Sequence, residues 1–270
     1  MSMINYFDVK YDGEFKELKN NSTNRHFYGY SNLYNEEVFI KCIEQSILFQ
    51  SEVAMTRFLY PDRLLDTGEI KNIGFILYRW MDLEELIIDQ RNMFYELGIK
   101  LAKFHMEAEQ RCGFDFDSKI SKKIKELFNK LPPVCQHIIS DSTMSRFYLI
   151  SDYIDAEYQT TNSTIIHGDF GLRNVKLFKS EIVLLDFERC RRDIAWMDLI
   201  KFFNREANTP EKKKRFLIGY RCVKELPEPS HQLKMALILY EAMGILKYTL
   251  THKNTMFFQM AVTMLNSIKE

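Results

Sequence analysis

The sequence predicts an α+β protein in which a small β-rich N-terminal part is followed by a larger, mainly helical part. Over residues 14–80, short β-like runs alternate with polar breaks. After Trp80 nearly all of the sequence reads as helix, except for a strand-rich island over residues 163–187. A chain of 270 residues is long enough for two lobes with a substantial core. We place the division between residues 80 and 81.

The N-terminal part is predicted to contain five strands and one helix. Three strands come from the runs EFKEL, RHFYGY and NEEVFIKCI, which begin at Glu14 and end at Ile43. A helix is predicted over residues 47–59, and Pro61 closes it. Two further short strands follow, and the second of them is GFILYRW. These elements make a sheet with one helix beside it.

The C-terminal part is predicted from helical periodicity. Over residues 91–109, Leu97, Leu101 and Phe104 fall on one helical face together with His105. Long amphipathic runs cover residues 211–224 and the sequence from Gln232 onward. We therefore expect these segments to pack as helices around a common core.

Composition excludes several classes of function. The 37 basic residues cancel the 37 acidic ones, so no net field attracts nucleic acid. The five cysteines are an odd number without CxxC spacing, which argues against a disulfide framework and a zinc site. The first residues lack the pattern of a secretory signal, and the longest apolar stretch is too short to span a membrane. We expect a cytoplasmic monomer or homodimer without a nucleic-acid or membrane partner.

The strand-rich island carries the residues that indicate chemistry. An apolar strand leads to His167, Gly168 and Asp169. Asn174 follows Asp169 by five positions, and two short strands then end at Asp186. Phosphoryl transfer to a hydroxyl group requires a carboxylate near the attacking oxygen, oxygen ligands for magnesium and cations on the phosphates. Asp169, Asn174 and Asp186 supply the first two requirements in the expected order.

The sequences HGDFGLRN and LLDFE resemble those of the aminoglycoside phosphotransferase and choline kinase superfamily, whose members are relatives of protein kinases. The resemblance implies a bilobal protein-kinase-like fold, with residues 1–80 as the nucleotide-binding lobe and residues 81–270 as the catalytic and substrate-binding lobe. It implies transfer of the γ-phosphoryl group from ATP, or from GTP, to a hydroxyl group of an antibiotic-, choline- or sugar-like molecule. Asp169 is then the catalytic base, and Asn174 and Asp186 hold Mg²⁺.

The residues after Asp186 also follow the family pattern in part. Glu188 stands where many protein kinases have glycine, which points to the small-molecule branch. The segment from Asp193 to Asp198 resembles the family sequence G-D-P-x-x-D-L, although Arg192 and Ile194 replace its glycine and proline. The resemblance implies that Asp198 braces the catalytic loop, and that Asp193 either braces this loop or contacts the substrate.

Other residues are expected near the catalytic loop or the acceptor. We expect His167 to organise the loop through hydrogen bonds. Arg173 belongs to the same loop, and Tyr240 and Glu241 lie in the C-terminal helices that line the acceptor site in relatives. Acidic residues are sparse from Lys201 onward, which disfavours a polycationic aminoglycoside as the acceptor.

The cation on the phosphates is expected to be Lys41, in the strand EVFIKCI. A lysine in an apolar strand is costly unless it is paired, so we expect a carboxylate partner from the following helix. Glu52 fits this role, and Glu44 is a weaker rival. We further expect Asp169, Asn174 and Asp186 to converge on one cleft.

The remaining nucleotide contacts are less well marked. The loop that would cover the phosphates contains only Gly29, so Asn and Ser residues would form its turn, and Ser22 is a candidate phosphate contact. Backbone groups of the segment 78–81 are expected to bind adenine, through Tyr78, Trp80 and Met81.

Two alternative functions stay open. A nucleotide-binding regulatory pseudokinase would explain the glycine-poor loop and the altered segment at Asp193. An atypical protein kinase is less favoured, because of Glu188 and because no long activation segment is visible.

Overall fold

The structure is a computed structural model that describes residues 2–19, 24–87, 92–109 and 115–269. The chain forms two compact units, Met1–Leu86 with Arg173–Cys190, and Ile87–Leu172 with Arg191–Glu270. The break therefore falls after Leu86 rather than after residue 80, and the segment 173–190 joins the first unit. The physical reason is a bridge in which the backbone groups of Glu84 and Leu177 exchange two hydrogen bonds of 2.9 Å.

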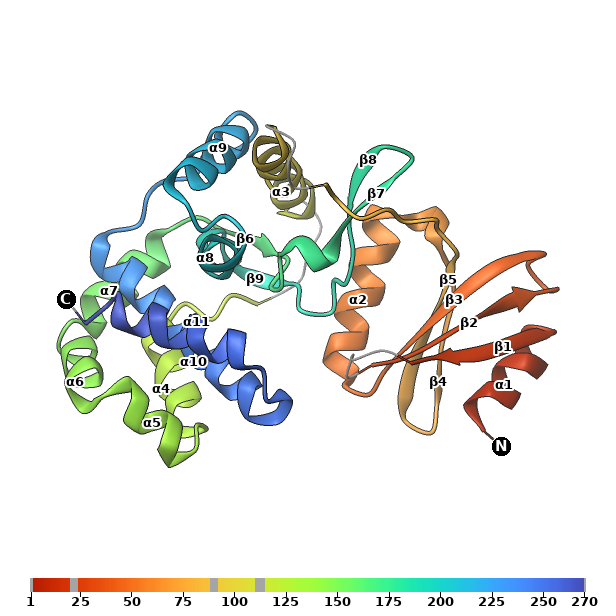
Figure 1. Ribbon diagram of the computed structural model, residues 1–270, viewed down its shortest axis with the longest axis horizontal. Helices are drawn as coiled ribbons and strands as arrows, with labels where there is room; N and C mark the ends of the chain where they lie inside the picture. Colours follow the sequence, from red (N-terminus) through yellow and green to blue (C-terminus); the bar gives the residue numbers. More distant parts are fainter. Residues whose placement is uncertain (1, 20–23, 88–91, 110–114, 270) are drawn as a thin grey trace. The chain divides into compact units, whose positions relative to one another are not determined.

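The first unit is built on a five-stranded antiparallel sheet with the order β1-β2-β3-β5-β4 (Figure 1). The strands are β1 (Gly13–Leu18), β2 (Arg25–Ser31), β3 (Glu36–Ile43), β4 (Leu64–Ile70) and β5 (Ile73–Arg79). A two-stranded hairpin, β7 (Val175–Phe178) and β8 (Glu181–Leu184), also belongs to this unit. The α+β class and the five N-terminal strands predicted from the sequence are confirmed.

Two helices pack against this sheet through different sets of side chains. Helix α1 (Met3–Lys10) lies outside the predicted elements, and its Phe7 packs in a cluster with Ile40. Helix α2 (Ser46–Leu59) packs through Phe49 against a second cluster that contains Ile43. Successive side chains of a strand point to opposite faces. Lys41 therefore lies on the α2 side of β3.

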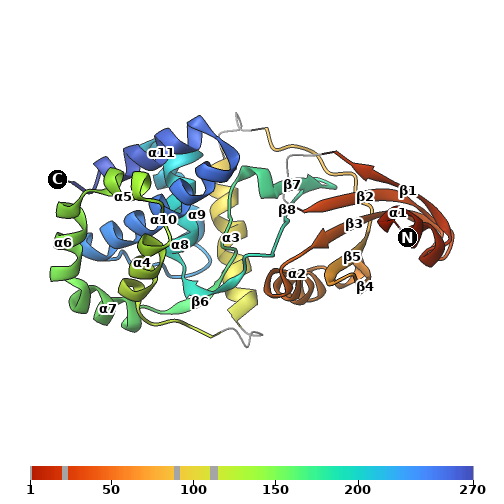
Figure 2. The same cartoon turned by 90° about the horizontal axis from the view of Figure 1, so that it is seen from below.

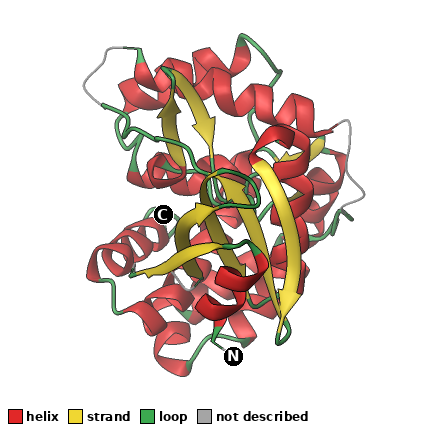
Figure 3. Ribbon diagram, turned by 90° about the vertical axis from the view of Figure 1, so that its right-hand side faces the viewer, coloured by secondary structure: helices red, strands yellow, loops and turns green. Residues whose placement is uncertain are grey.

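The second unit is mainly helical (Figures 2 and 3). Its helices are α3 (Met93–Glu109), α4 (Ile120–Asn129), α5 (Pro133–Ile139), α6 (Asp141–Leu149), α7 (Ser151–Thr160), α8 (Trp196–Arg205), α9 (Pro210–Arg221), α10 (His231–His252) and α11 (Thr255–Asn266). No helix in the described ranges is both long and apolar enough to cross a membrane.

One short sheet interrupts these helices. Strand β6 (Ser163–Ile166) pairs antiparallel with β9 (Arg191–Ile194), so Ser163 lies opposite Ile194 and Ile166 opposite Arg191. The expectation of helix after residue 187 is therefore wrong for β9. The reason is non-local, because β9 is a strand through its pairing with β6, and Ile194 is buried there.

Helices α3 and α9 approach each other closely at two glycines. A Cβ atom added to Gly98 would lie 2.1 Å from the carbonyl oxygen of Phe216, and one added to Gly219 would lie 2.0 Å from that of Tyr95. Only glycine permits this approach. The predicted apolar face of α3 is buried in this unit, including His105.

Candidate functional site

Lys41 is the centre of a buried charged cluster in the first unit. Its side chain is 8% exposed, and its Nζ atom lies 3.4 Å from Oε2 of Glu52 and 3.2 Å from Oε2 of Glu188. The same ammonium group forms a short ion pair with Asp186. Glu52 is therefore the helix carboxylate beside Lys41, whereas the rival Glu44 is exposed.

This cluster has a formal surplus of negative charge. Burial alone would lower the pKa of Lys41, but the carboxylates of Glu52, Asp186 and Glu188 outweigh this effect and raise it. Glu52 also accepts a hydrogen bond of 2.8 Å from the hydroxyl group of Tyr78, whose own pKa is raised by burial. One ammonium group thus faces three carboxylates, an arrangement suited to binding a further cation.

The hairpin β7–β8 brings the two expected metal ligands to one end of its ladder. Val175 pairs with Leu184, and the N–H of Leu185 donates to the carbonyl oxygen of Asn174 at 2.9 Å. Asn174, just before β7, and Asp186, just after Leu185, therefore lie at the same end of the hairpin. Asp186 has a left-handed backbone with φ 68°, uncommon for a residue other than glycine.

The donor atoms of Asn174 and Asp186 fit a magnesium ion. Carboxylate and amide oxygens are hard ligands, and Mg²⁺ usually takes one or two carboxylates together with substrate phosphates rather than a cage made only of protein atoms. Within the described parts of the chain, no group of three or more His, Cys, Asp or Glu side chains could hold a metal ion by itself. A site at the hairpin would therefore depend on the nucleotide for its other ligands.

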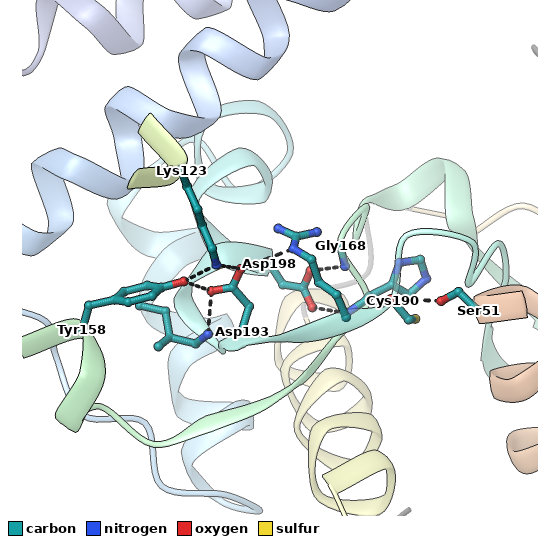
Figure 4. Close-up of polar contacts among 10 residues, drawn as sticks. Ser51, Lys123, Tyr158, Gly168, Cys190, Asp193 and Asp198 are labelled. Atoms are coloured by element: carbon teal, nitrogen blue, oxygen red, sulfur yellow. Dashed lines mark hydrogen bonds and ion pairs between the residues drawn. The ribbon is translucent and has the colours of Figure 1, made fainter. Parts of the chain in front are cut away.

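Two side chains that the sequence did not single out support this cluster. The amide nitrogen of Asn24 donates to Oε2 of Glu188 at 2.6 Å. The hydroxyl group of Ser51, which precedes Glu52 on α2, donates to the carbonyl oxygen of Cys190 at 2.9 Å (Figure 4). In the sequence, only the position of Ser51 next to Glu52 could have indicated that Ser51 supports this cluster. The candidate Ser22 lies outside the described residues.

The predicted adenine-binding segment belongs to the end of β5 and the residues after it. Tyr78 is buried, and its hydroxyl group donates a hydrogen bond to Glu52. The N–H of Trp80 donates to the carbonyl oxygen of Glu37 at 3.0 Å, which extends the pairing of β3 with β5. This N–H is therefore engaged in the sheet. Met81 follows, half-buried.

In the second unit, Asp198 at the start of α8 holds the backbone that follows β6. Its Oδ2 atom accepts the N–H of His167 and its Oδ1 atom accepts that of Gly168, both at 2.7 Å (Figure 4). Gly168 has φ 75°, a conformation that favours glycine. Burial would raise the pKa of Asp198, but hydrogen bonds and charge from His105 and His167 outweigh burial and lower it. His105 Nε2 lies 3.0 Å from Oδ2 of Asp198.

Asp169 is buried beside α8. The ammonium group of Lys201 donates to its Oδ1 atom at 2.8 Å. Further along, the carboxylate of Glu206 accepts a hydrogen bond from the backbone of Leu172, and burial raises the pKa of Glu206. Neither Lys201 nor Glu206 was predicted. The spacing of Lys201 from Asp198, three residues along one helix, was a signal that could have indicated a shared face.

Asp193, on β9, is enclosed by protein groups. Its side chain is fully buried, with Nζ of Lys123 at 3.2 Å and Nε of Arg191 at 3.3 Å from Oδ2. The hydroxyl group of Tyr158 donates a short hydrogen bond to Oδ1 (Figure 4). These contacts favour the bracing role expected for Asp193 over direct contact with a substrate.

The structure thus brings most predicted residues into two sets. Lys41, Glu52, Asn174, Asp186 and Glu188 belong to the first unit. His167, Asp169, Asp193 and Asp198 belong to the second, as do Tyr240 and Glu241 on α10. Arg173, at the start of the segment 173–190, is exposed. Convergence of the two sets on one cleft stays a prediction.

A cavity of about 460 Å³ lies in the second unit between α6, α7 and α10. Its walls are largely apolar and include Phe147, Ile154, Met235 and Leu239. The predicted site residues are not part of its lining. The cavity is therefore separate from the loop that carries Asp169.

Comparison with known proteins connects these residues to a family. The model of the phosphotransferase enzyme family matches residues 50–230 of the chain, which include β6, the hairpin β7–β8 and α8. A search of curated proteins gives no match.

Several solved structures share the fold. Choline kinase LicA from Streptococcus pneumoniae has a TM-score of 0.69 at 14% identity, and the match covers 97% of each chain. A thermostable mutant of aminoglycoside phosphotransferase APH(4)-Ia, in complex with ADP and hygromycin B, has a TM-score of 0.68 at 12% identity and covers 99% of this chain and 98% of its own. Amicoumacin kinase hAmiN, in complex with AMP-PNP and Ca²⁺, has a TM-score of 0.67 at 14% identity and covers 94% and 87%.

Proposed function

Because the chain belongs to the phosphotransferase enzyme family, we propose that it transfers the γ-phosphoryl group of ATP to a hydroxyl group of a small molecule. The observation that supports this most is the position of Asp186. It follows the hairpin β7–β8, which Asn174 precedes, and it also pairs with Lys41. A metal ligand beside a phosphate-binding lysine is what a metal–nucleotide complex requires.

The residues of the first unit would bind the nucleotide. Lys41 donates hydrogen bonds to the phosphates, and Glu52 holds its ammonium group in place. Asn174 and Asp186 would hold Mg²⁺, and the bound ion would offset the negative charge of the phosphates. Residues 78–81 are the proposed contacts of adenine, with Met81 as the main one, because the N–H of Trp80 is used by the sheet.

The residues of the second unit would act on the acceptor. Asp169 accepts the proton of the acceptor hydroxyl group and orients this group toward the phosphorus atom. Asp198 and His105 keep the loop in the required conformation through the N–H groups of His167 and Gly168. Tyr240 and Glu241 are the proposed acceptor contacts. The acceptor class is an antibiotic-, choline- or sugar-like alcohol.

The test is ADP release from Mg-ATP in the presence of aminoglycosides, macrolides, choline, amino alcohols and sugars, one at a time. With the acceptor so identified, we expect Asp169→Asn to lower turnover about 10²- to 10⁴-fold while binding of Mg-ATP is retained. Asp152→Asn, at an exposed position on α7, is the matched control. Equal turnover in D169N and wild type would refute the role of Asp169.

The same experiment separates the rival functions. Thermal stabilisation by Mg-ATP without ADP release from any acceptor would contradict transfer and favour a nucleotide-binding regulatory protein. Phosphorylation of a peptide, without that of a small molecule, would favour an atypical protein kinase.

A further inference from the structure

Lys201 is a partly buried cation in direct contact with the proposed catalytic base. It lies on α8, and its side chain is 20% exposed while that of Asp169 is 4% exposed. Its Nζ atom is 2.8 Å from Oδ1 of Asp169 and 5.8 Å from the ring centre of Phe257 on α11. The ammonium group is therefore held between the base and an aromatic ring.

The contact with Asp169 uses only part of the hydrogen-bonding capacity of Lys201. An ammonium group has three N–H donors, and the bond to Asp169 uses one of them. Desolvation of two opposite charges costs free energy that their attraction does not reliably return, so a buried pair is weak support for stability alone. A cation one hydrogen bond away from a catalytic carboxylate is also close to the atoms on which that carboxylate acts.

The chemistry of the reaction identifies the charge that Lys201 would meet. A bond forms between the acceptor oxygen and the γ-phosphorus atom, and the bond from this phosphorus to the bridging oxygen of ADP breaks, so that ADP keeps the electron pair. The acceptor proton goes to Asp169. During transfer, negative charge is spread over the three equatorial oxygens of the phosphoryl group.

We propose that Lys201 donates a hydrogen bond to the transferring phosphoryl group while it also holds Asp169 in position. The inference rests on the proposed function and adds a second cation to it. Lys41 faces three carboxylates and would bind the phosphates of the nucleotide, whereas Lys201 would bind the phosphoryl group during its transfer. A preorganised donor aimed at developing charge is among the largest contributions that a side chain makes to catalysis.

The experiment compares binding of Mg-ADP with binding of Mg-ADP plus fluoroaluminate, which imitates the phosphoryl group in transfer and needs no identified acceptor. We expect wild type to bind the fluoroaluminate complex much more tightly than Mg-ADP. In Lys201→Met this advantage falls roughly 10²-fold, while affinity for Mg-ADP itself is unchanged. Lys201→Arg, which keeps a positive charge, recovers part of the advantage.

Arg205→Met is the matched control, because Arg205 lies on the same helix and stacks on the same ring, 4.7 Å from the centre of Phe257, but pairs with Glu206. It keeps the full fluoroaluminate advantage. If K201M also keeps that advantage, Lys201 only positions Asp169 and the inference is overturned. A different outcome refutes the proposed function. If wild type binds neither Mg-ATP nor Mg-ADP, both the proposed function and the inference are wrong. Should K201M not fold, the comparison of wild type with K201R and Lys201→Gln decides: equal advantages in all three overturn the inference.

Discussion

Two buried clusters of charge, one in each unit, differ in their balance. Around Lys41 one ammonium group faces three carboxylates, and Asp186 keeps 31% of its side chain exposed. Around Asp193 the ratio is reversed, since Lys123 and Arg191 both meet one fully buried carboxylate. A cluster with surplus negative charge and an accessible oxygen is suited to binding a metal ion. A closed cluster whose carboxylate is already neutralised is suited to bracing the fold.

The strongest way to test this contrast is to remove the lysine from each cluster. Lys41→Met should lower turnover about 10²- to 10³-fold, because the phosphates lose a preorganised donor. Lys123→Met should leave turnover within a few-fold of wild type, since Arg191 and Tyr158 remain on Asp193, and should lower the melting temperature. Steady-state kinetics and thermal unfolding of both variants measure the difference. A loss of turnover in K123M as large as that in K41M would remove the distinction between the clusters.

Asp198 tests whether the loop of the second unit depends on one carboxylate. Asp198→Asn should reduce the free energy of unfolding by about 3 kcal/mol at pH 7, because an amide cannot accept both backbone N–H groups and also serve His105. The pKa of Asp198 is lowered from its ordinary value of 3.8. Its stabilisation is therefore complete above that value and is lost as pH falls through the lower folded value.

Urea unfolding at neutral pH and below about pH 4 measures this effect. The gap between wild type and D198N should narrow at the lower pH. D152N, which changes an exposed aspartate, should show no comparable gap at either pH. A constant gap would mean that the ionised form of Asp198 is not what stabilises the loop.

Ser51 tests the support beneath the first cluster. Ser51→Ala should cost about 1–2 kcal/mol of unfolding free energy, because the carbonyl oxygens of Phe187 and Cys190 each lose the hydrogen bond from the Ser51 hydroxyl group. Affinity for Mg-ATP should fall as well, since this contact fixes the backbone that follows Asp186. Ser46→Ala, at an exposed position on the same helix, is the control. Normal affinity in S51A would show that α2 positions Glu52 without fixing the segment after Asp186.

The sequence was most informative where the signal is local. Alternation and helical repeat predicted the five strands of the first unit and helices such as α2 and α9, because each depends on which face of its own element is buried. The family motif indicated Asp169, Asn174 and Asp186. Lys41 could be matched with Glu52 because a lysine in an apolar strand is costly unless it is paired, and Glu52 lies on the helix that follows.

What the sequence did not predict depends on contacts between distant segments. Strand β9 exists through its pairing with β6, and the hairpin joins the first unit through the bridge from Glu84 to Leu177. Lys201 was one of many lysines until the loop after β6 placed Asp169 beside α8. Such partners follow from the fold and cannot be inferred from spacing alone.

Glu206 offers the finest test of the contrast, because it is a carboxylate of the second unit whose charge is poorly balanced. Its side chain is 8% exposed, Arg205 lies 3.5 Å away, and within the described residues its Oε2 atom has no hydrogen-bond partner. Burial raises its pKa above the ordinary 4.5, so the ionised form is disfavoured in the folded protein. Glu206→Gln should therefore change stability by less than about 1 kcal/mol at pH 8, and in the favourable direction, because Gln can still accept the N–H of Leu172.

The stability difference between wild type and E206Q should change with pH in a defined direction. Wild type should gain stability from Glu206 as pH falls through the raised folded pKa toward 4.5, and E206Q should lack that gain, so the advantage of the variant shrinks between pH 8 and about pH 5. Unfolding free energies at the two pH values measure this. A variant clearly less stable than wild type at pH 8 would mean that the ionised carboxylate is compensated. The second unit would then hold a second balanced cluster, at the loop beside Asp169.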